Sequence, residues 1–159
     1  MSFVFPDSSQ KTLVSKAIAD DRAFVPAWKK KDIYAMCNQA RQYDVLKSLP
    51  AGYVMSDINS GPPILVFTDH FVVGGPYHRN ERAILDMLDF FETNLDNPRR
   101  IAAERKIDYV AWCDPGDLTG PKYENSPALA VHLAEGDPPS WLEPLSPKDD
   151  RLQVYRVLR

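Results

Sequence analysis

The chain has 159 residues, a formal net charge of −3, 44% hydrophobic and 26% charged residues, and two cysteines. This length suits one domain with its own core, and the composition is that of an ordinary globular protein. A negative net charge without a basic stripe argues against a phosphate-backbone partner, so we expect no nucleic-acid binding.

The sequence shows no targeting segment. Residues Met1–Gln10 lack the basic start and apolar centre of a signal peptide, and the most apolar run, Ile64–Phe67, is far too short to span a bilayer. Taken as a complete chain, the sequence predicts a cytoplasmic protein. That expectation does not hold for a piece of a longer chain.

The first part of the chain predicts a helix and a connection. The stretch Asp7-Ser8-Ser9-Gln10 resembles a capping box, and apolar residues then repeat at helical spacing to about Asp20. A proline-containing connection continues to Trp28. We therefore divide the chain into an N-terminal helix and connection, residues 1–28, and a single α/β domain, residues 29–159.

Next come the elements of the first half of that domain. A second helix is predicted over Asp32–Leu49, and a short strand over Tyr53–Ser56. The prolines before Ile64–Phe67 favour a short helix there, with a strand as the alternative. A further strand is predicted over Phe71–Val73.

In the second half, helices and strands continue to alternate. A helix is predicted after Asn80, with an apolar stripe of Ile84, Met87, Leu88 and Phe91. A second helix runs from Asn97-Pro98 to Lys106 and is followed by the clear strand Asp108–Cys113. The last predicted elements are a helix from Ser126-Pro127 to Gly136, a surface turn at Pro138–Leu142 and an edge strand over Leu152–Leu158. This order predicts an α/β fold with three layers: a mostly parallel sheet of about four strands, with helices on both faces.

The two cysteines allow two interpretations. Cys37 and Cys113 are either buried small hydrophobic residues or partners in a disulfide, and the second requires an oxidising compartment. Neither belongs to a CxxC pair or a ligand cluster, so we expect no metal. Neither G-x-G-x-x-G nor G-x-x-x-x-G-K-[ST] occurs, so we expect no nucleotide cofactor.

The loop from Gly74 to Asn80 is the strongest candidate site, because it follows a strand and precedes a helix. Glycines would let a ligand approach the backbone, and free amides at the helix start would attract an anion. The candidate ligand-binding residues are Gly75, Tyr77, His78, Arg79 and Asn80. The alternative is that Tyr77 and His78 only hold the loop and that Asn80 only caps the helix.

A second polar group combines Asp57 with Asp69 and His70. Asp57 follows a strand, where it would act as a general base, bind a sugar hydroxyl or accept hydrogen bonds from loop amides. His70 beside Asp69 suggests an acid-base pair, although neighbouring residues on a strand seldom face the same way. We include Asp57 and His70 among the candidate ligand-binding residues.

Several of these stretches together resemble a known family. The succession D-x-x-x-G-P-x-[IL]-L, T-x-H-x-V and G-P-Y-H-R-N, followed by a helix ending in F-F, is similar to the C-terminal soluble regions of bacterial polytopic inner-membrane proteins. These proteins are of the glycosyltransferase-like, lipid-linked-sugar (GT-C type) class and are mostly uncharacterised. The matching residues are Asp57, Gly61, Pro62, Ile64, Leu65, Thr68, His70, Val72 and Gly75 to Asn80, followed by Ile107 to Cys113, Trp141 to Pro144 and Tyr155 to Val157.

The resemblance runs from about Cys37 to the C-terminus, and its most specific element is GPYHRN. It implies a domain on the periplasmic face of the inner membrane, attached to a membrane portion of the same or a larger protein. It also implies a Cys37–Cys113 disulfide. In membrane enzymes of this type the catalytic acid lies in loops of the membrane portion, so the resemblance implies a non-catalytic domain.

Three functional hypotheses follow. The first is a non-catalytic periplasmic domain that assists substrate or acceptor recognition for a membrane glycosyltransferase-like protein. The second is a small stand-alone enzyme acting on a phosphorylated metabolite, with His78 as the acid-base group and Arg79 on an anionic or sugar-phosphate ligand. The third is an interaction module that uses exposed Trp28 and Trp141.

Overall fold

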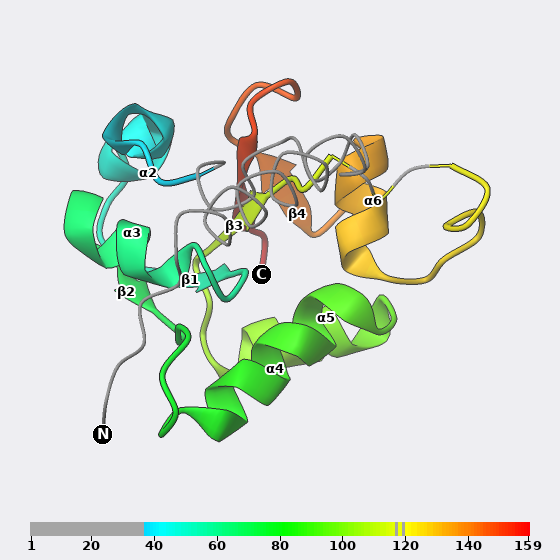
Figure 1. Ribbon diagram of the computed structural model, residues 1–159, viewed down its shortest axis with the longest axis horizontal. Coiled ribbons are helices and arrows are strands. Elements are labelled where there is room, and N and C mark those ends of the chain that lie inside the picture. The colour runs from blue at the N-terminus through cyan, green and yellow to red at the C-terminus, as the bar shows by residue number, and fades with distance from the viewer. Residues whose placement is uncertain (1–36, 117, 119) are drawn as a thin grey trace, which may run out of the picture. The chain divides into compact units, whose positions relative to one another are not determined.

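The computed structural model describes residues 37–116, 118 and 120–159 (Figure 1). The predicted N-terminal helix and the predicted domain boundary after Trp28 lie outside these residues. The longest helix that the structure describes has 12 residues, and within this part of the chain no helix has the length and apolar character needed to cross a membrane.

Helices and strands alternate over most of the described chain. The helical segments are the 3-10 helix η2 (Ala40–Tyr43), α2 (Asp44–Lys47), α3 (Gly61–Phe67), α4 (Glu81–Glu92), α5 (Asp96–Glu104) and α6 (Leu129–Glu135). The strands are β1 (Tyr53–Ser56), β2 (Phe71–Val72), β3 (Tyr109–Cys113), β4 (Leu142–Pro144) and β5 (Leu152–Val157). The predicted α/β class is confirmed.

The five strands form one mixed sheet in the order β2-β1-β3-β5-β4. Strand β1 pairs in parallel with β2 and β3, whereas β5 pairs antiparallel with β3 and with β4. The expectation of a mostly parallel sheet of about four strands is therefore corrected, because half of the pairings are antiparallel and there is a fifth strand.

The unpredicted strand is β4, which also changes the position of β5. Strand β4 has only three residues and ends in Pro144, so it carries no alternating pattern. A proline without an N–H suits an edge strand, which is the position of β4. Strand β5 was expected at the edge, but it lies inside the sheet between β3 and β4.

Strands β1, β3 and β5 contribute side chains to cores on both faces of the sheet. In β1, Val54 is buried in a cluster with Tyr43 and Ile64, while the next residue, Met55, is buried with Phe90. Helices α2 and α3 cover the first face, and α4, α5 and α6 cover the second (Figure 1). Alternate side chains of a strand point to opposite faces, so a sheet with two buried faces has apolar residues at consecutive positions.

The helix predicted over Asp32–Leu49 is confirmed from Ala40 to Lys47, but it is wrong over residues 37–39. Gln39 is extended, with φ −95° and ψ 132°, and the helical segment begins at Ala40. The side chain of Gln42 accepts a hydrogen bond from the Gln39 N–H at 2.9 Å, as in a capping box. The apolar spacing through Cys37 suggested a continuous helix and hid this start signal.

The other helices form where they were predicted, although α3 begins earlier, at Gly61, and α6 begins later, at Leu129. The prolines lie in the first turn of α3, and Gly136 ends α6 in the left-handed conformation with φ 70°. Helix α5 begins at Asp96 rather than at Asn97, because the side chain of Asn94 accepts hydrogen bonds from both backbone amides, at 2.9 and 3.0 Å. Pro98 still lies in the first turn.

The turn before β4 lies partly at the surface, but its tryptophan is buried. Trp141 is only 8% exposed, and its ring meets the ring of Phe90 edge-on at 6.3 Å between centroids. The expectation of an exposed Trp141 that meets a partner is therefore wrong. Trp28, the other residue of that hypothesis, lies outside the described residues.

Candidate functional site

A disulfide joins Cys37 to Cys113 at the end of β3, with 6.1 Å between the Cα atoms. This is the pairing that the family resemblance implied. It fastens the segment that precedes η2 to the sheet across a sequence separation of 76 residues. Nearby, the buried hydroxyl of Tyr43 donates a hydrogen bond to the Cys37 carbonyl, and burial raises the pKa of this phenol, which therefore stays protonated.

Asp57 lies beside this disulfide, just after β1. One carboxylate oxygen accepts the backbone N–H groups of Asn59 and Ser60, at 3.2 and 3.1 Å. The other accepts the Ser60 hydroxyl at 2.6 Å and the Cys113 N–H at 3.1 Å. Asp57 thus organises its own loop and joins the carboxyl end of β1 to that of β3.

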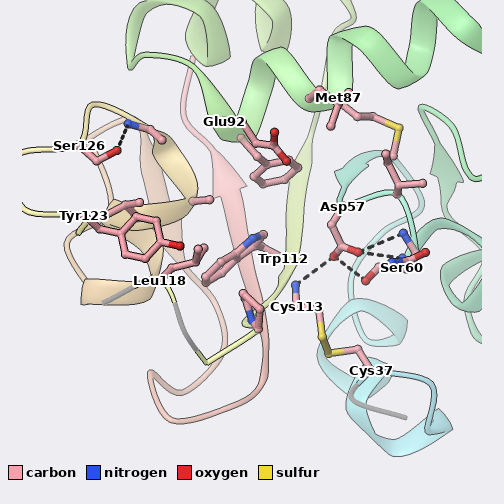
Figure 2. A pocket seen from close by; sticks show the side chains of 18 of the residues that line it. Cys37, Asp57, Ser60, Met87, Glu92, Trp112, Cys113, Leu118, Tyr123 and Ser126 are labelled. Carbon is pink, nitrogen blue, oxygen red and sulfur yellow. Dashed lines mark hydrogen bonds between the residues drawn. A yellow bond between two sulfur atoms is a disulfide. The ribbon is translucent and has the colours of Figure 1, made fainter. Parts of the chain in front are cut away.

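A cavity of about 730 Å³ opens at these strand ends (Figure 2). Its wall is mainly apolar, with polar groups placed around it. The lining residues are Cys37, Asn38, Asp57, Ile58, Asn59, Ser60, Pro63, Met87, Leu88, Phe91, Glu92, Trp112, Cys113, Pro115, Leu118, Tyr123, Ser126, Ala128, Ala130 and Val131. The crevice beyond the carboxyl ends of parallel strands is the usual place for a ligand in open α/β sheets.

Only Asp57 and the disulfide cysteines among the predicted site residues line this cavity. Sequence reasoning missed the contributions of Glu92, Trp112 and Tyr123. Glu92 follows the predicted apolar stripe of its helix and was not singled out, and Trp112 was interpreted only as part of a strand. Their convergence depends on how α4 packs on the sheet, which no local pattern shows.

The loop Gly74–Asn80 does not line the cavity, and its glycines serve close packing. A Cβ on Gly74 would lie 2.6 Å from the side-chain amide nitrogen of Asn80 and 3.1 Å from the Cβ of Ala83 on α4. A Cβ on Gly61, at the start of α3, would lie 2.3 Å from the carbonyl oxygen of Gly74. These glycines let α3, the loop and α4 approach one another closely.

Most polar residues of that loop lie at the surface. His78 and Arg79 are exposed, and Tyr77 is 54% exposed. The loop is closed by backbone hydrogen bonds from Tyr77 to Gly75 at 2.7 Å and from Asn80 to Tyr77 at 3.0 Å. Asn80 occupies the N-cap position of α4, but its side chain makes no capping hydrogen bond.

His70 is buried and lies far along the strands from Asp57. Its Nδ1 accepts the Gly52 N–H at 3.1 Å, and its Nε2 donates to the Leu46 carbonyl at 2.6 Å. Because His70 precedes β2 while Asp57 follows β1, and these neighbouring strands are parallel, the two residues lie at opposite ends of the strands. Asp69 is exposed.

No protein-family model and no curated protein matches the chain. Among solved structures, the fold is similar to the C-terminal globular domain of an oligosaccharyltransferase from Archaeoglobus fulgidus, with a TM-score of 0.53 and 14% sequence identity. The similarity covers 84% of this chain and 98% of that domain. The likeness therefore establishes a shared fold, which extends over nearly the whole of the archaeal domain.

Proposed function

We propose that the chain is a non-catalytic domain of a membrane glycosyltransferase-like protein, on the periplasmic face of the inner membrane, where it assists recognition of the substrate or acceptor. The observation that carries the proposal is the fold shared with 98% of the C-terminal globular domain of an oligosaccharyltransferase. The membrane partner is the membrane portion of the same or a larger protein.

The disulfide supports the compartment in this proposal. Disulfides persist in oxidising environments such as the periplasm and are rare in the cytosol, where thiols are kept reduced. The Cys37–Cys113 bond joins two segments 76 residues apart and closes part of the cavity wall, so it contributes to the architecture of the candidate site.

The use of the polar side chains supports a recognition role. Asp57 accepts four hydrogen bonds from its surroundings, and both ring nitrogens of His70 are engaged. An acid-base group needs a free position for the proton of a substrate. Both residues therefore fit the architecture of a binding domain better than a reacting centre.

The alternative enzyme, acting on a phosphorylated metabolite at the Gly74–Asn80 loop, has less support. The space beside Gly74 is filled by Asn80 and α4, so the backbone there is in contact with protein. His78 and Arg79 are exposed to solvent and do not line the cavity, so no enclosing wall strengthens their attraction to a phosphate.

The test uses the gene in its native host. Deletion of the segment that encodes residues 37–159 is expected to reduce sugar transfer from a lipid-linked donor in isolated membranes, at unchanged abundance of the remaining protein. The isolated chain is expected to transfer no sugar. Transfer by the isolated chain that His78→Ala abolishes would contradict the proposal and favour the stand-alone enzyme.

A further inference from the structure

The cavity beyond β1 and β3 has the size and wall of a small-molecule site. Its volume of about 730 Å³ lies inside the range of about 300–1,000 Å³ that such sites occupy. Met87, Phe91 and Val131 contribute apolar surface from two helices. A ligand with an apolar body would be removed from water there.

Three aromatic side chains line the cavity from separate parts of the fold. Phe91 belongs to α4, Trp112 to β3, and Tyr123 to the segment before α6. In the view of Figure 2, Trp112 lies between Tyr123 and Asp57, and Glu92 lies above them. The face of an aromatic ring attracts a cation, and tryptophan does so most strongly.

The charges around the cavity have one sign. Asp57 and Glu92 contribute carboxylates, and no lysine, arginine or histidine is among the lining residues that the structure describes. Lys122 comes near, with its Nζ 5.1 Å from the centre of the Tyr123 ring, but it is exposed and does not line the cavity. The resulting field favours a cation and disfavours an anion.

The hydrogen bonds of Asp57 narrow the kind of cation. A carboxylate has about four acceptor positions, and Asn59, Ser60 and Cys113 already supply four donors. The negative charge remains, yet no position is left for the N–H of a ligand. Glu92 is exposed and makes no hydrogen bond or ion pair in the described part of the chain, so its charge is available to a ligand.

From these observations we infer that the cavity binds a small organic cation: a fully alkylated ammonium group carried on an apolar body. Such a group has no N–H to satisfy, so it needs only negative charge and aromatic faces around it. Trp112 and Tyr123 supply the aromatic faces, and Asp57 and Glu92 supply the charge. The inference does not depend on the proposed role in glycosyl transfer.

The experiment compares two probes of the same shape: benzyltrimethylammonium and its neutral isostere neopentylbenzene. Binding to the full chain is measured by titration while the indole N–H of Trp112 is followed by NMR. We expect the cation to bind about tenfold more tightly than the isostere. Glu92→Gln and Tyr123→Leu should each weaken cation binding about threefold or more, and should change binding of the neutral probe little.

The matched control is Glu81→Gln, which removes an exposed carboxylate from the other end of α4. It should leave both affinities unchanged. Equal binding of the two probes would overturn the inference and leave a merely apolar cavity. A failure of both probes to shift the Trp112 signal would also overturn it, as would equal losses in Glu92→Gln and Glu81→Gln.

Discussion

The carboxylate of Asp57 accepts a hydrogen bond from the backbone N–H of Cys113, which lies 56 positions later in the chain. This contact joins the carboxyl ends of β1 and β3 at the point where the disulfide also reaches β3. One edge of the cavity is therefore held by a covalent bond and by a charged acceptor together. Rigid strand ends of this kind position a binding site well.

The first prediction concerns this acceptor. Asp57→Asn replaces one carboxylate oxygen with an NH2 group. Each oxygen accepts two hydrogen bonds from N–H or O–H donors, and the NH2 group cannot accept them, so at least two hydrogen bonds are lost. We expect the free energy of unfolding to fall by about 1–3 kcal/mol in urea titrations. Asp69→Asn, at an exposed position, is the control and should change stability by less than about 0.5 kcal/mol. Equal effects of the two changes would contradict a structural role for Asp57.

The second prediction concerns the disulfide. Replacing Cys37 and Cys113 together with alanine removes a cross-link between segments 76 residues apart, and this enlarges the conformational freedom of the unfolded chain. The expected loss of stability is about 2–5 kcal/mol, measured by urea unfolding of oxidised protein. For the wild type, mass spectrometry of the denatured, unreduced protein should find neither cysteine as a free thiol. Two thiols that react with an alkylating agent after secretion to the periplasm would contradict the assignment.

The third prediction separates two histidines that the sequence presents as equal candidates. His70→Phe would leave the Gly52 N–H without its partner in a buried region. It would also remove the hydrogen bond from His70 to the Leu46 carbonyl, which keeps the one from the Leu49 N–H at 3.0 Å. The unpaired N–H costs about 1–3 kcal/mol and the lost hydrogen bond about 1 kcal/mol, so we expect a loss of about 2–4 kcal/mol in urea unfolding. His78→Ala, at an exposed loop position, should change stability by less than about 0.5 kcal/mol. A loss of stability below about 0.5 kcal/mol in His70→Phe would contradict a structural role for the two hydrogen bonds of the His70 ring.

Local patterns were sufficient for most elements of the fold. The strand Tyr53–Ser56 matches the prediction residue for residue, and the short helix after Pro62-Pro63 forms as expected, because proline chemistry and apolar runs act over a few residues. Sheet order depends on contacts between distant segments. Strand β4 is defined by its pairing with β5 rather than by its own three residues, so its presence and the internal position of β5 were not predictable locally.

In the candidate site, too, local features were predictable and contacts between distant segments were not. Asp57 was recognisable because it follows a strand, and the disulfide was implied by the family resemblance. The cavity itself is formed where α4 and the segment around Tyr123 meet the strand ends, which is a tertiary property. Gly74 and Gly75 were interpreted as giving a ligand access to the backbone, yet in the structure Gly74 is in contact with Asn80 and α4.

The fourth prediction concerns alkaline pH. Burial raises the pKa of Tyr155 to about 12, and repulsion from Asp114 adds to the effect. The phenol of the unfolded chain releases its proton near pH 10, so above about pH 10 the unfolded state binds fewer protons than the folded state. The contribution of Tyr155 to stability is therefore complete below about pH 10 and is lost as the pH rises through about 12.

This loss is measured by urea unfolding at pH 9 and pH 11. We expect the wild type to lose stability between the two, with about 1–2 kcal/mol of the loss caused by Tyr155. Tyr155→Phe should show a smaller loss over the same interval. Tyr77→Phe is the matched control, because Tyr77 is 54% exposed, and it should behave like the wild type. An identical pH dependence in all three proteins would contradict the assignment.

The last prediction tests whether the Gly74–Asn80 loop is a packing unit. A Cβ on Gly61 would lie 2.3 Å from the carbonyl oxygen of Gly74, so Gly61→Ala requires the backbone to move. We expect a loss of about 1–3 kcal/mol in urea unfolding, with changed amide NMR signals over Tyr77–Asn80. Gly75→Ala is the control: its Cβ would meet the half-exposed ring of Tyr77 at 3.0 Å, and this ring can turn away. If Gly61→Ala were no more destabilising than Gly75→Ala, the close approach of α3 to the loop would be wrong. In that case the glycines would again be candidates for ligand contact.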